Sequence, residues 1–280
     1  MLQRSPTYFV SRPDEDRIAL FLKKFLPKSF VYALIRFKNV YIQQSIFKRV
    51  RAFPVRSKKF LIDQVKKELP DFDVDKHFTP SYNPWEQRMC LVPNSDFFNA
   101  IKDKSATVVT DHIESFEEKG IKLKSGEFLD ADIIVTATGL VLQNFGGVTI
   151  SVNNNPVNVS KTMTYKSLMY SDIPNFVNSF GYINASWTLK ADLTSTYLCR
   201  LIKHMDKNEY LSACPRKPLD VDETYDWLKD FSSGYIQRSL DLHPQQGSKK
   251  PWVNYQDYIK DWIDVKFSKL EDGNLIFSKD

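Results

Sequence analysis

Glycine is scarce in this chain, which has nine glycines in 280 residues. A loop that grips a dinucleotide needs glycines spaced as G-x-G-x-x-G between a strand and a helix, because bare backbone and a helix N-terminus must meet the diphosphate. None of the nine glycines stands in that spacing. These 280 residues therefore contain no recognisable loop for holding a diphosphate.

Cysteine and long apolar runs are also scarce. The three cysteines, Cys90, Cys199 and Cys214, fit neither a disulfide framework nor a zinc site. The stretch closest to a membrane span, residues 30–41, is interrupted by basic residues and is too short to cross a bilayer. The first residues lack the apolar core of a secretory signal. We therefore expect a cytoplasmic protein with no transmembrane segment and no metal site.

Acidic residues are scarce in the first quarter of the chain. Residues 1–70 contain 16 Lys and Arg against 5 Asp and Glu, whereas residues 71–280 contain 23 against 29. Such a basic segment suits nucleic acid, an anionic membrane surface or a phosphate-bearing cofactor. Solvated helix faces are the plainer explanation of interspersed lysines, and composition alone leaves both open.

What the chain does contain is 42% apolar residues, which can bury a substantial core in one large or two modest domains. A helical period predicts helices over residues 14–26, 29–50, 55–69, 187–205 and 255–267. Prolines separate the first three, which resemble an inserted helical subdomain. The aromatic, proline-rich stretch 80–93 is predicted to be a loop.

A period of two replaces the helical period from Ala106 onward. It predicts strands over residues 107–110, 113–116, 120–124 and 176–182, a turn at Ser125-Gly126 and a hairpin over residues 148–159. The continuous apolar run Ile133-Ile134-Val135 is typical of a strand that is buried on both faces of a sheet.

That run leads into the glycine turn Ala137-Thr138-Gly139. Because glycine has no side chain, a ribose or a diphosphate can lie against its backbone, so Ala137, Thr138 and Gly139 are candidate cofactor-binding residues. A strand that ends in glycine is also common in ordinary turns. Other motifs in the chain are needed to distinguish a cofactor-binding turn from an ordinary one.

Three motifs together resemble those of the flavin-containing and Baeyer-Villiger-type monooxygenases, which bind FAD and NADPH. Gln3-Arg4-Ser5-Pro6 matches the Q-R-[ST]-P strand end of that family, and residues 82–88 match a Y-x-P stretch followed by an arginine. Residues 131–139 match its A-D-x-x-[IVL]-x-A-T-G linker. The motifs occur in family order, and residues 181–190 resemble a later strand-to-helix turn beside the flavin.

The resemblance implies an α/β fold, namely an incomplete pair of Rossmann-like FAD- and NAD(P)-binding domains with an inserted helical subdomain. Residues 1–9 and 88–139 would be a remnant of the NADP-binding domain, with residues 10–87 as the helical insert. Residues 140–280 would be the C-terminal part of the FAD-binding domain. In the family both glycine loops precede the Q-R-[ST]-P strand, so we expect Met1 to match an internal position and this chain alone to bind FAD poorly.

The resemblance also implies roles for individual residues. Arg4 would pair with the 2′-phosphate of NADPH, since a guanidinium binds phosphate through two hydrogen bonds, and Ser5 would assist it. A solvated arginine is the alternative for Arg4. Arg88 resembles the active-site arginine that stabilises negative charge on the oxygenated flavin. The alternative is a loop arginine that pairs with Glu86 or stacks on Trp85.

Ser186, Trp187 and Thr188 stand where a helix begins, so their backbone N–H groups are candidates for contact with the flavin pyrimidine edge. Lys190 could add positive charge. Ordinary helix capping by Ser186 and core packing of Trp187 are the alternative. One position departs from the family pattern, because Gln87 stands where lysine usually helps to hold NADPH.

The resemblance implies an FAD- and NADPH-dependent monooxygenase that uses O2 to oxygenate a small ketone, amine or sulfide through a C4a-peroxyflavin. Another chain would supply the N-terminal part, and no nucleic-acid partner is expected. Two alternatives remain open. One is a non-catalytic fragment, and the other is a basic helical module, residues 10–70, that binds a partner, anionic lipid or nucleic acid.

Overall fold

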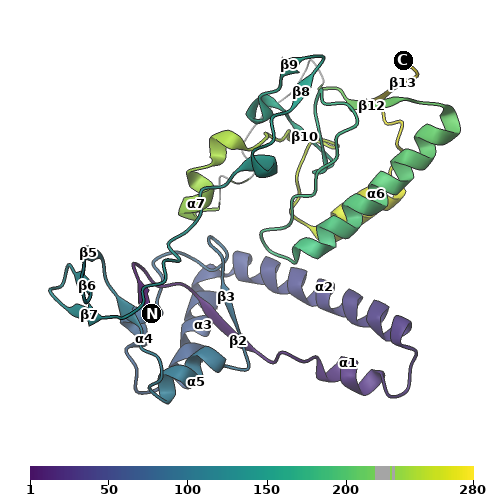
Figure 1. Ribbon diagram of the computed structural model, residues 1–280. Coiled ribbons are helices and arrows are strands. Elements are labelled where there is room, and N and C mark those ends of the chain that lie inside the picture. Colours follow the sequence, from purple (N-terminus) through teal and green to yellow (C-terminus); the bar gives the residue numbers. More distant parts are fainter. Residues whose placement is uncertain (218–227, 229–230) are drawn as a thin grey trace. The chain divides into compact units, whose positions relative to one another are not determined.

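The computed structural model describes residues 1–217, 228 and 231–280. The chain folds as two compact units, Met1–Gly139 and Leu140–Asp280, which are drawn in Figure 1. Each unit has a hydrophobic core of its own. The correspondence of these units to an NADP-binding and an FAD-binding domain stays a prediction.

The first unit contains two parallel pairs of strands. β1 (Leu2–Gln3) pairs with β4 (Val109–Thr110), and β2 (Phe9–Arg12) pairs with β3 (Cys90–Pro93). Parallel neighbours need long crossover connections, and helices supply most of them. The helices of this unit are α1 (Arg17–Leu22), α2 (Lys28–Ala52), α3 (Pro54–Glu68), α4 (Val74–His77) and α5 (Asp96–Lys102).

A phenylalanine cluster forms the core of the first unit. Phe78 and Phe98 are each 1% exposed. The ring of Phe9 stacks on Phe97 at 5.2 Å and meets Phe78 edge-on at 5.3 Å. These are the favourable geometries for aromatic pairs, and they hold β2 against α4 and α5.

The predicted helices over residues 29–50 and 55–69 are confirmed as α2 and α3. The helix predicted over residues 14–26 is shorter than expected. The carboxylate of Asp16 accepts hydrogen bonds from the backbone N–H groups of Ile18 and Ala19 and so caps the start of α1. Residues 23–26 form turns instead of continuing the helix.

An antiparallel sheet follows in the first unit, made of β5 (Ile113–Glu117), β6 (Gly120–Leu123) and β7 (Phe128–Asp130). It confirms the strands predicted over residues 113–116 and 120–124. Gly126 adopts φ +90° in the turn between β6 and β7, a conformation that favours glycine.

The buried strand predicted at Ile133-Ile134-Val135 is wrong. These residues form no strand, and Ile133 and Val135 are 83% and 84% exposed. A strand buried on both faces needs neighbouring strands for its backbone hydrogen bonds and side chains to cover it. In the described part of the chain, no strand pairs with this run.

Two further local predictions need correction. Residues 176–182 form no strand, and the predicted loop over residues 80–93 ends early because β3 begins at Cys90. β3 pairs with β2, which lies more than 75 residues earlier in the sequence. Local periodicity cannot reveal such a partner.

The second unit packs helices against small antiparallel strand pairs. Its strand pairs are β8 (Ser151–Val152) with β9 (Asn155–Pro156), β10 (Thr164–Tyr165) with β11 (Met169–Tyr170), and β12 (Ser212–Pro215) with β13 (Leu275–Ser278). Its α-helices are α6 (Trp187–Asn208), α7 (Gly234–Gln237) and α8 (Tyr258–Phe267), with 3-10 segments η1 (Asn144–Gly147), η2 (Val159–Lys161) and η3 (Leu240–Leu242). α6 and α8 confirm the two predicted helices, and β8–β9 confirms the hairpin.

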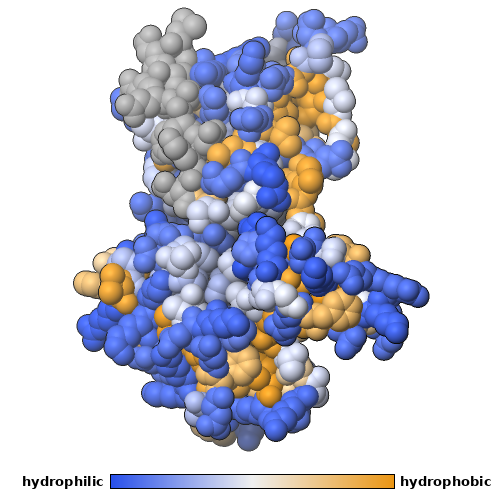
Figure 2. Space-filling model, turned by 90° about the vertical axis from the view of Figure 1, so that its left-hand side faces the viewer, coloured by the Kyte–Doolittle hydropathy of each residue, from blue (hydrophilic) through white to orange (hydrophobic). Residues whose placement is uncertain are grey.

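Large apolar side chains remain on the surface of both units. Figure 2 shows hydrophobic patches among hydrophilic ones on the face that it draws. In the first unit, Phe25 and Phe37 are 71% and 70% exposed. Among the described helices, none is both long enough and apolar enough to span a bilayer.

Candidate functional site

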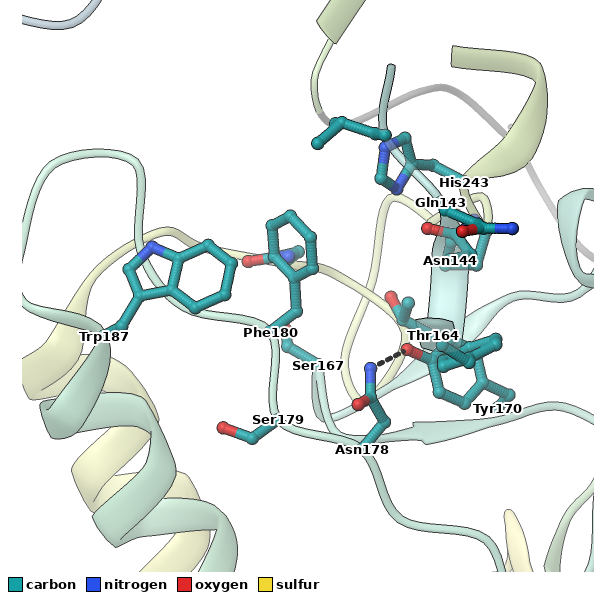
Figure 3. A pocket seen from close by; sticks show the side chains of 14 residues that line it. Gln143, Asn144, Thr164, Ser167, Tyr170, Asn178, Ser179, Phe180, Trp187 and His243 are labelled. Atoms are coloured by element: carbon teal, nitrogen blue, oxygen red, sulfur yellow. Dashed lines mark hydrogen bonds between the residues drawn. The ribbon is translucent and has the colours of Figure 1, made fainter. Parts of the chain in front are cut away.

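A cavity of about 240 Å³ opens in the second unit beside the first turn of α6. Figure 3 shows Phe180 and Trp187 on one side of it and the pair Tyr170 and Asn178 on another. The lining comes from the loop that leads into η1, the β10–β11 turn, the segment before α6 and the segment after η3. Residues distant in sequence therefore meet around one space.

An aromatic wall borders the cavity at the start of α6. The rings of Phe180 and Trp187 lie 5.1 Å apart, and Trp187 is 48% exposed. Gly181 makes this arrangement possible, because a Cβ at this position would lie 2.1 Å from Cγ of Trp187. Any larger residue would have to displace the indole ring. Trp187 therefore faces the cavity margin instead of the core.

Two buried hydroxyl groups line the cavity without a protein partner. Thr164 Oγ1 and Ser167 Oγ are buried, and neither has a hydrogen-bond partner among the described residues. A buried polar atom without a partner costs free energy, so native proteins rarely leave one. The cavity lining therefore contains hydrogen-bonding groups that no described protein group satisfies.

Asn178 and Tyr170 form an uncharged, hydrogen-bonded pair in the cavity lining. Asn178 Nδ2 donates a hydrogen bond of 2.9 Å to the hydroxyl oxygen of Tyr170. Burial raises the pKa of Tyr170 to about 12, so the phenol stays protonated at neutral pH. This side of the cavity suits an uncharged ring with hydrogen-bonding edges.

The first turn of α6 has no side-chain cap. Ser186 occupies the N-cap position but makes no side-chain cap hydrogen bond, and its Oγ lies 2.7 Å from Thr188 Oγ1. The alternative interpretation of Ser186, ordinary side-chain capping of the helix, is therefore not observed. The first N–H groups of a helix have no intrahelical partner and carry partial positive charge.

The suggestion that Lys190 adds charge beside a flavin is wrong. Lys190 is 1% exposed, and its Nζ lies 2.8 Å from Asp261 Oδ2 on α8. The hydroxyl of Tyr182 donates to the same oxygen at 2.7 Å. Lys190 therefore joins two helices inside the unit and is absent from the cavity lining.

Arg88 lies in the first unit, at the end of a loop that is tied to the start of the chain. Its side chain is exposed, and its carbonyl oxygen accepts a hydrogen bond of 3.3 Å from Thr7 Oγ1. Tyr82 donates to the same Thr7 hydroxyl at 3.0 Å, and Tyr8 donates to the Tyr82 carbonyl at 2.6 Å. The loop is held by its backbone while the guanidinium projects outward.

The two side chains proposed as alternative partners of Arg88 have other neighbours. Glu86 accepts 2.9 Å hydrogen bonds from the backbone N–H and Nδ2 of Asn83, and these bonds lower the pKa of its carboxyl. Trp85 meets the ring of Phe47 edge-on at 5.5 Å. Trp85 Nε1 is buried and has no partner in the described part of the chain.

Arg4 and Ser5 follow β1 directly, and both are exposed. Gln3 fixes the end of this strand by donating from Nε2 to the His77 carbonyl at 2.7 Å and to Thr110 Oγ1 at 2.9 Å. Arg4 thus leaves the carboxyl end of a strand that has a parallel neighbour. Ligands of α/β sheets bind at this edge.

Ala137, Thr138 and Gly139 are exposed, and Gly139 has φ +116° at the end of the first unit. The structure places Trp187 in the cavity lining, whereas Ser186 and Thr188 flank it in sequence and are not part of that lining. It places Arg4, Ser5 and Arg88 in the first unit.

Sequence analysis missed the cavity residues Thr164, Ser167, Tyr170 and Asn178. Thr164 and Tyr170 lie in the short strands β10 and β11, and Ser167 and Asn178 lie in the turn and loop that follow, so no local motif marks them. Gly181 carried a readable signal, because a glycine just before a predicted helix implies a close backbone approach. No cluster of His, Cys, Asp or Glu suited to a metal ion occurs among the residues described.

Comparison with known proteins relates both sequence and fold to flavoenzymes. The chain is 47% identical over 281 residues to the FAD-containing monooxygenase EthA of Mycobacterium tuberculosis, a match that covers 100% of this chain and 57% of the relative. The probable FAD-binding monooxygenase AlmA of Acinetobacter baylyi is 42% identical over 284 residues, which cover 100% of this chain and 56% of the relative. No protein-family model matches the sequence.

Two solved structures share the fold. An oxidized steroid monooxygenase bound to NADP superposes with a TM-score of 0.68 at 16% identity, over 100% of this chain and 62% of that one. OTEMO in complex with FAD and NADP gives a TM-score of 0.64 at 15% identity, over 99% of this chain and 62% of that one. The predicted α/β flavoprotein fold is therefore confirmed. The chain is thus similar in sequence to FAD-containing monooxygenases and spans about 57% of the length of the first of these relatives.

Proposed function

We propose that this chain forms part of an FAD- and NADPH-dependent monooxygenase of the Baeyer-Villiger type, and that the cavity beside α6 receives the flavin ring. The single observation that carries the proposal is the cavity, with its aromatic wall and the two unpaired hydroxyls of Thr164 and Ser167. The chain spans about 57% of the length of the curated relatives that it matches. The activity of the whole protein is accordingly part of the proposal.

The residues present fit a flavin ring. A flat heterocycle can lie beside Trp187 and Phe180, and its carbonyl and nitrogen edges can bond with the hydroxyls of Thr164 and Ser167. The first N–H groups of α6, next to Ser186 and Thr188, suit the electron-rich pyrimidine edge. The diphosphate of FAD finds no glycine loop in these 280 residues, so we propose that a further polypeptide segment holds it.

The first unit supplies the charged groups of the proposal. Arg4 and Ser5 would bind the 2′-phosphate of NADPH, and the exposed guanidinium of Arg88 would stabilise negative charge near the flavin. The backbone of Ala137, Thr138 and Gly139 would lie against a cofactor. When bound, FAD supplies the redox chemistry by accepting hydride from NADPH and activating O2.

The substrate is proposed as a small ketone, amine or sulfide, and the location as the cytoplasm. Gln87 lacks the charge of the lysine usual in the family. Preference for NADPH over NADH would therefore depend on Arg4. The competing hypothesis is that the chain is a non-catalytic fragment. Under that hypothesis, no flavin-dependent turnover is expected under any condition.

Flavin binding tests the proposal directly. We expect FAD titration of the purified chain to quench flavin fluorescence weakly, and co-expression with the glycine-loop segment of a relative such as EthA to give a yellow complex with NADPH-driven O2 uptake. Thr164→Val and Ser167→Ala should weaken FAD binding in that complex. A colourless complex, or the same FAD affinity in both variants, would overturn the assignment.

Two substitutions separate the roles of the arginines in that complex. Arg4→Gln should raise KM for NADPH about tenfold or more while changing KM for NADH little, because only NADPH carries the 2′-phosphate. Arg88→Gln should instead reduce kcat. Arg12→Gln, an exposed arginine at the end of β2, is the matched control. Equal effects on both coenzymes would refute the role of Arg4.

A further inference from the structure

Positive charge predominates in the sequence of the first helices. Residues 17–62 contain twelve Lys and Arg and no Asp or Glu. Two acidic side chains that pair with this segment, Asp16 with Lys38 and Asp63 with Lys59, stand immediately outside it in sequence. A segment of this length with a single sign of charge creates a positive field that attracts an anionic surface.

The same segment exposes an apolar stripe along α2. Phe30, Leu34, Phe37 and Tyr41 are 57%, 43%, 70% and 58% exposed. Their spacing of four, three and four residues places them on one face of the helix. The rings of Phe37 and Tyr41 stack at 6.4 Å. Water-facing aromatic residues in such a row are costly unless another phase or molecule covers them.

α1 and the turn that follows it continue this pattern. Ile18, Phe21 and Phe25 are 54%, 59% and 71% exposed, and the two phenylalanine rings lie 5.3 Å apart. The 2.5 Å ion pair between Asp16 and Lys38 ties the start of α1 to the middle of α2, and the two helices form a helical hairpin (Figure 1).

We propose that the α1–α2 hairpin, residues 17–52, binds the surface of a membrane that contains anionic lipid. Exposed phenylalanine and leucine side chains would enter the boundary between headgroups and acyl chains, and lysine and arginine would bind lipid phosphates. Charge complementarity favours this partner. A nucleic acid would leave the aliphatic residues uncovered, and a hydrophobic protein partner would leave the charge unbalanced. The inference does not depend on the proposed enzymatic activity.

Vesicle sedimentation tests this inference with the purified chain. We expect the chain to bind vesicles of phosphatidylcholine with 30% phosphatidylglycerol, and to bind pure phosphatidylcholine at least about tenfold more weakly. Raising the salt from 0.05 M to 0.5 M should reduce binding severalfold, because the Debye length shrinks. Equal binding to both vesicle types, or no binding at low salt, would overturn the proposal.

Variants separate the apolar and basic contributions. Lys23→Glu/Lys24→Glu and Phe37→Ser/Tyr41→Ser should each weaken vesicle binding about tenfold or more. Lys203→Glu/Lys207→Glu, on exposed positions of α6, is the matched control and should bind like the unmodified chain. Circular dichroism checks that each variant folds. Loss of as much binding in the control variant would show that the assignment is wrong. A dimer detected by light scattering for the unmodified chain, and a monomer for Phe37→Ser/Tyr41→Ser, would also overturn it, because the stripe would then be a contact between two copies.

Discussion

Lys190 on α6 and Asp261 on α8 form a buried ion pair, with Nζ and Oδ2 2.8 Å apart and side chains 2% and 7% exposed. The hydroxyl of Tyr182 donates to the same carboxylate oxygen. Burial raises the pKa of Tyr182 far above its usual value, and the nearby Asp261 carboxylate adds to this effect. An ion pair as well as apolar packing therefore joins α6 and α8, the two longest of the described helices in the second unit.

Removing one partner of this pair should destabilise the second unit strongly. Lys190→Met leaves the Asp261 carboxylate buried without its cation, and we expect a loss of about 3–5 kcal/mol in the free energy of unfolding. Urea denaturation measures this loss. The double variant Lys190→Met/Asp261→Leu should be less destabilised than Lys190→Met alone, and an equal loss would contradict the ion-pair explanation.

Gly181→Ala should displace the indole ring of Trp187, because the new Cβ would lie within 2.1 Å of it. We expect a shift in tryptophan fluorescence and a loss of about 1–3 kcal/mol in the free energy of unfolding. In the Trp187→Ala background the same substitution should cost little. Gly234→Ala is the control, since its Cβ would meet only the flexible end of Arg238.

Thr164→Val should leave the chain as stable as before or raise its free energy of unfolding by up to about 2 kcal/mol, because it removes a buried hydroxyl that has no partner. Ser171→Ala is the contrasting control. Ser171 Oγ accepts a 3.0 Å hydrogen bond from the buried N–H of Met163, so its loss should cost about 1–3 kcal/mol. A destabilised Thr164→Val variant would show that the hydroxyl has a partner in the ligand-free chain.

The first unit should lose stability as the pH falls from 7.5 to 5. Burial lowers the pKa of His77 below its ordinary 6.5, and the neighbouring charge of Lys76 adds to this effect. The unfolded chain then binds a proton that the folded chain resists, so the contribution is fully present above pH 6.5 and is lost below it. His77→Asn should flatten this dependence in urea titrations, whereas exposed His112→Asn should not.

Local sequence was sufficient for features that depend on a few neighbouring residues. The helical period predicted α2, α3, α6 and α8, and Asn153-Asn154 marked the β8–β9 turn, where both residues have positive φ. The three motifs predicted the flavoprotein family, which the comparisons support. These predictions depend only on helical spacing, on turn-forming residues and on short sequence motifs, all of which can be recognised in the chain itself.

Burial was not readable from local sequence. Ile133-Ile134-Val135 has the composition of a central strand, yet it is exposed because no described strand lies beside it. Lys190 stands next to a predicted cofactor turn, yet its side chain turns to Asp261, 71 residues later. Each outcome depends on partners that are distant in sequence.

By itself, the sequence determined the main helices and the resemblance to flavin-dependent monooxygenases, and it predicted Arg4, Arg88 and the turn before α6 as site residues. Only the tertiary structure decided that Thr164 and Ser167 share a cavity with Trp187, and that Lys190 belongs to the interior. The reason is physical. Helices and turns are set by contacts over a few residues, whereas a cavity and a buried charge exist only after distant segments have excluded water between them.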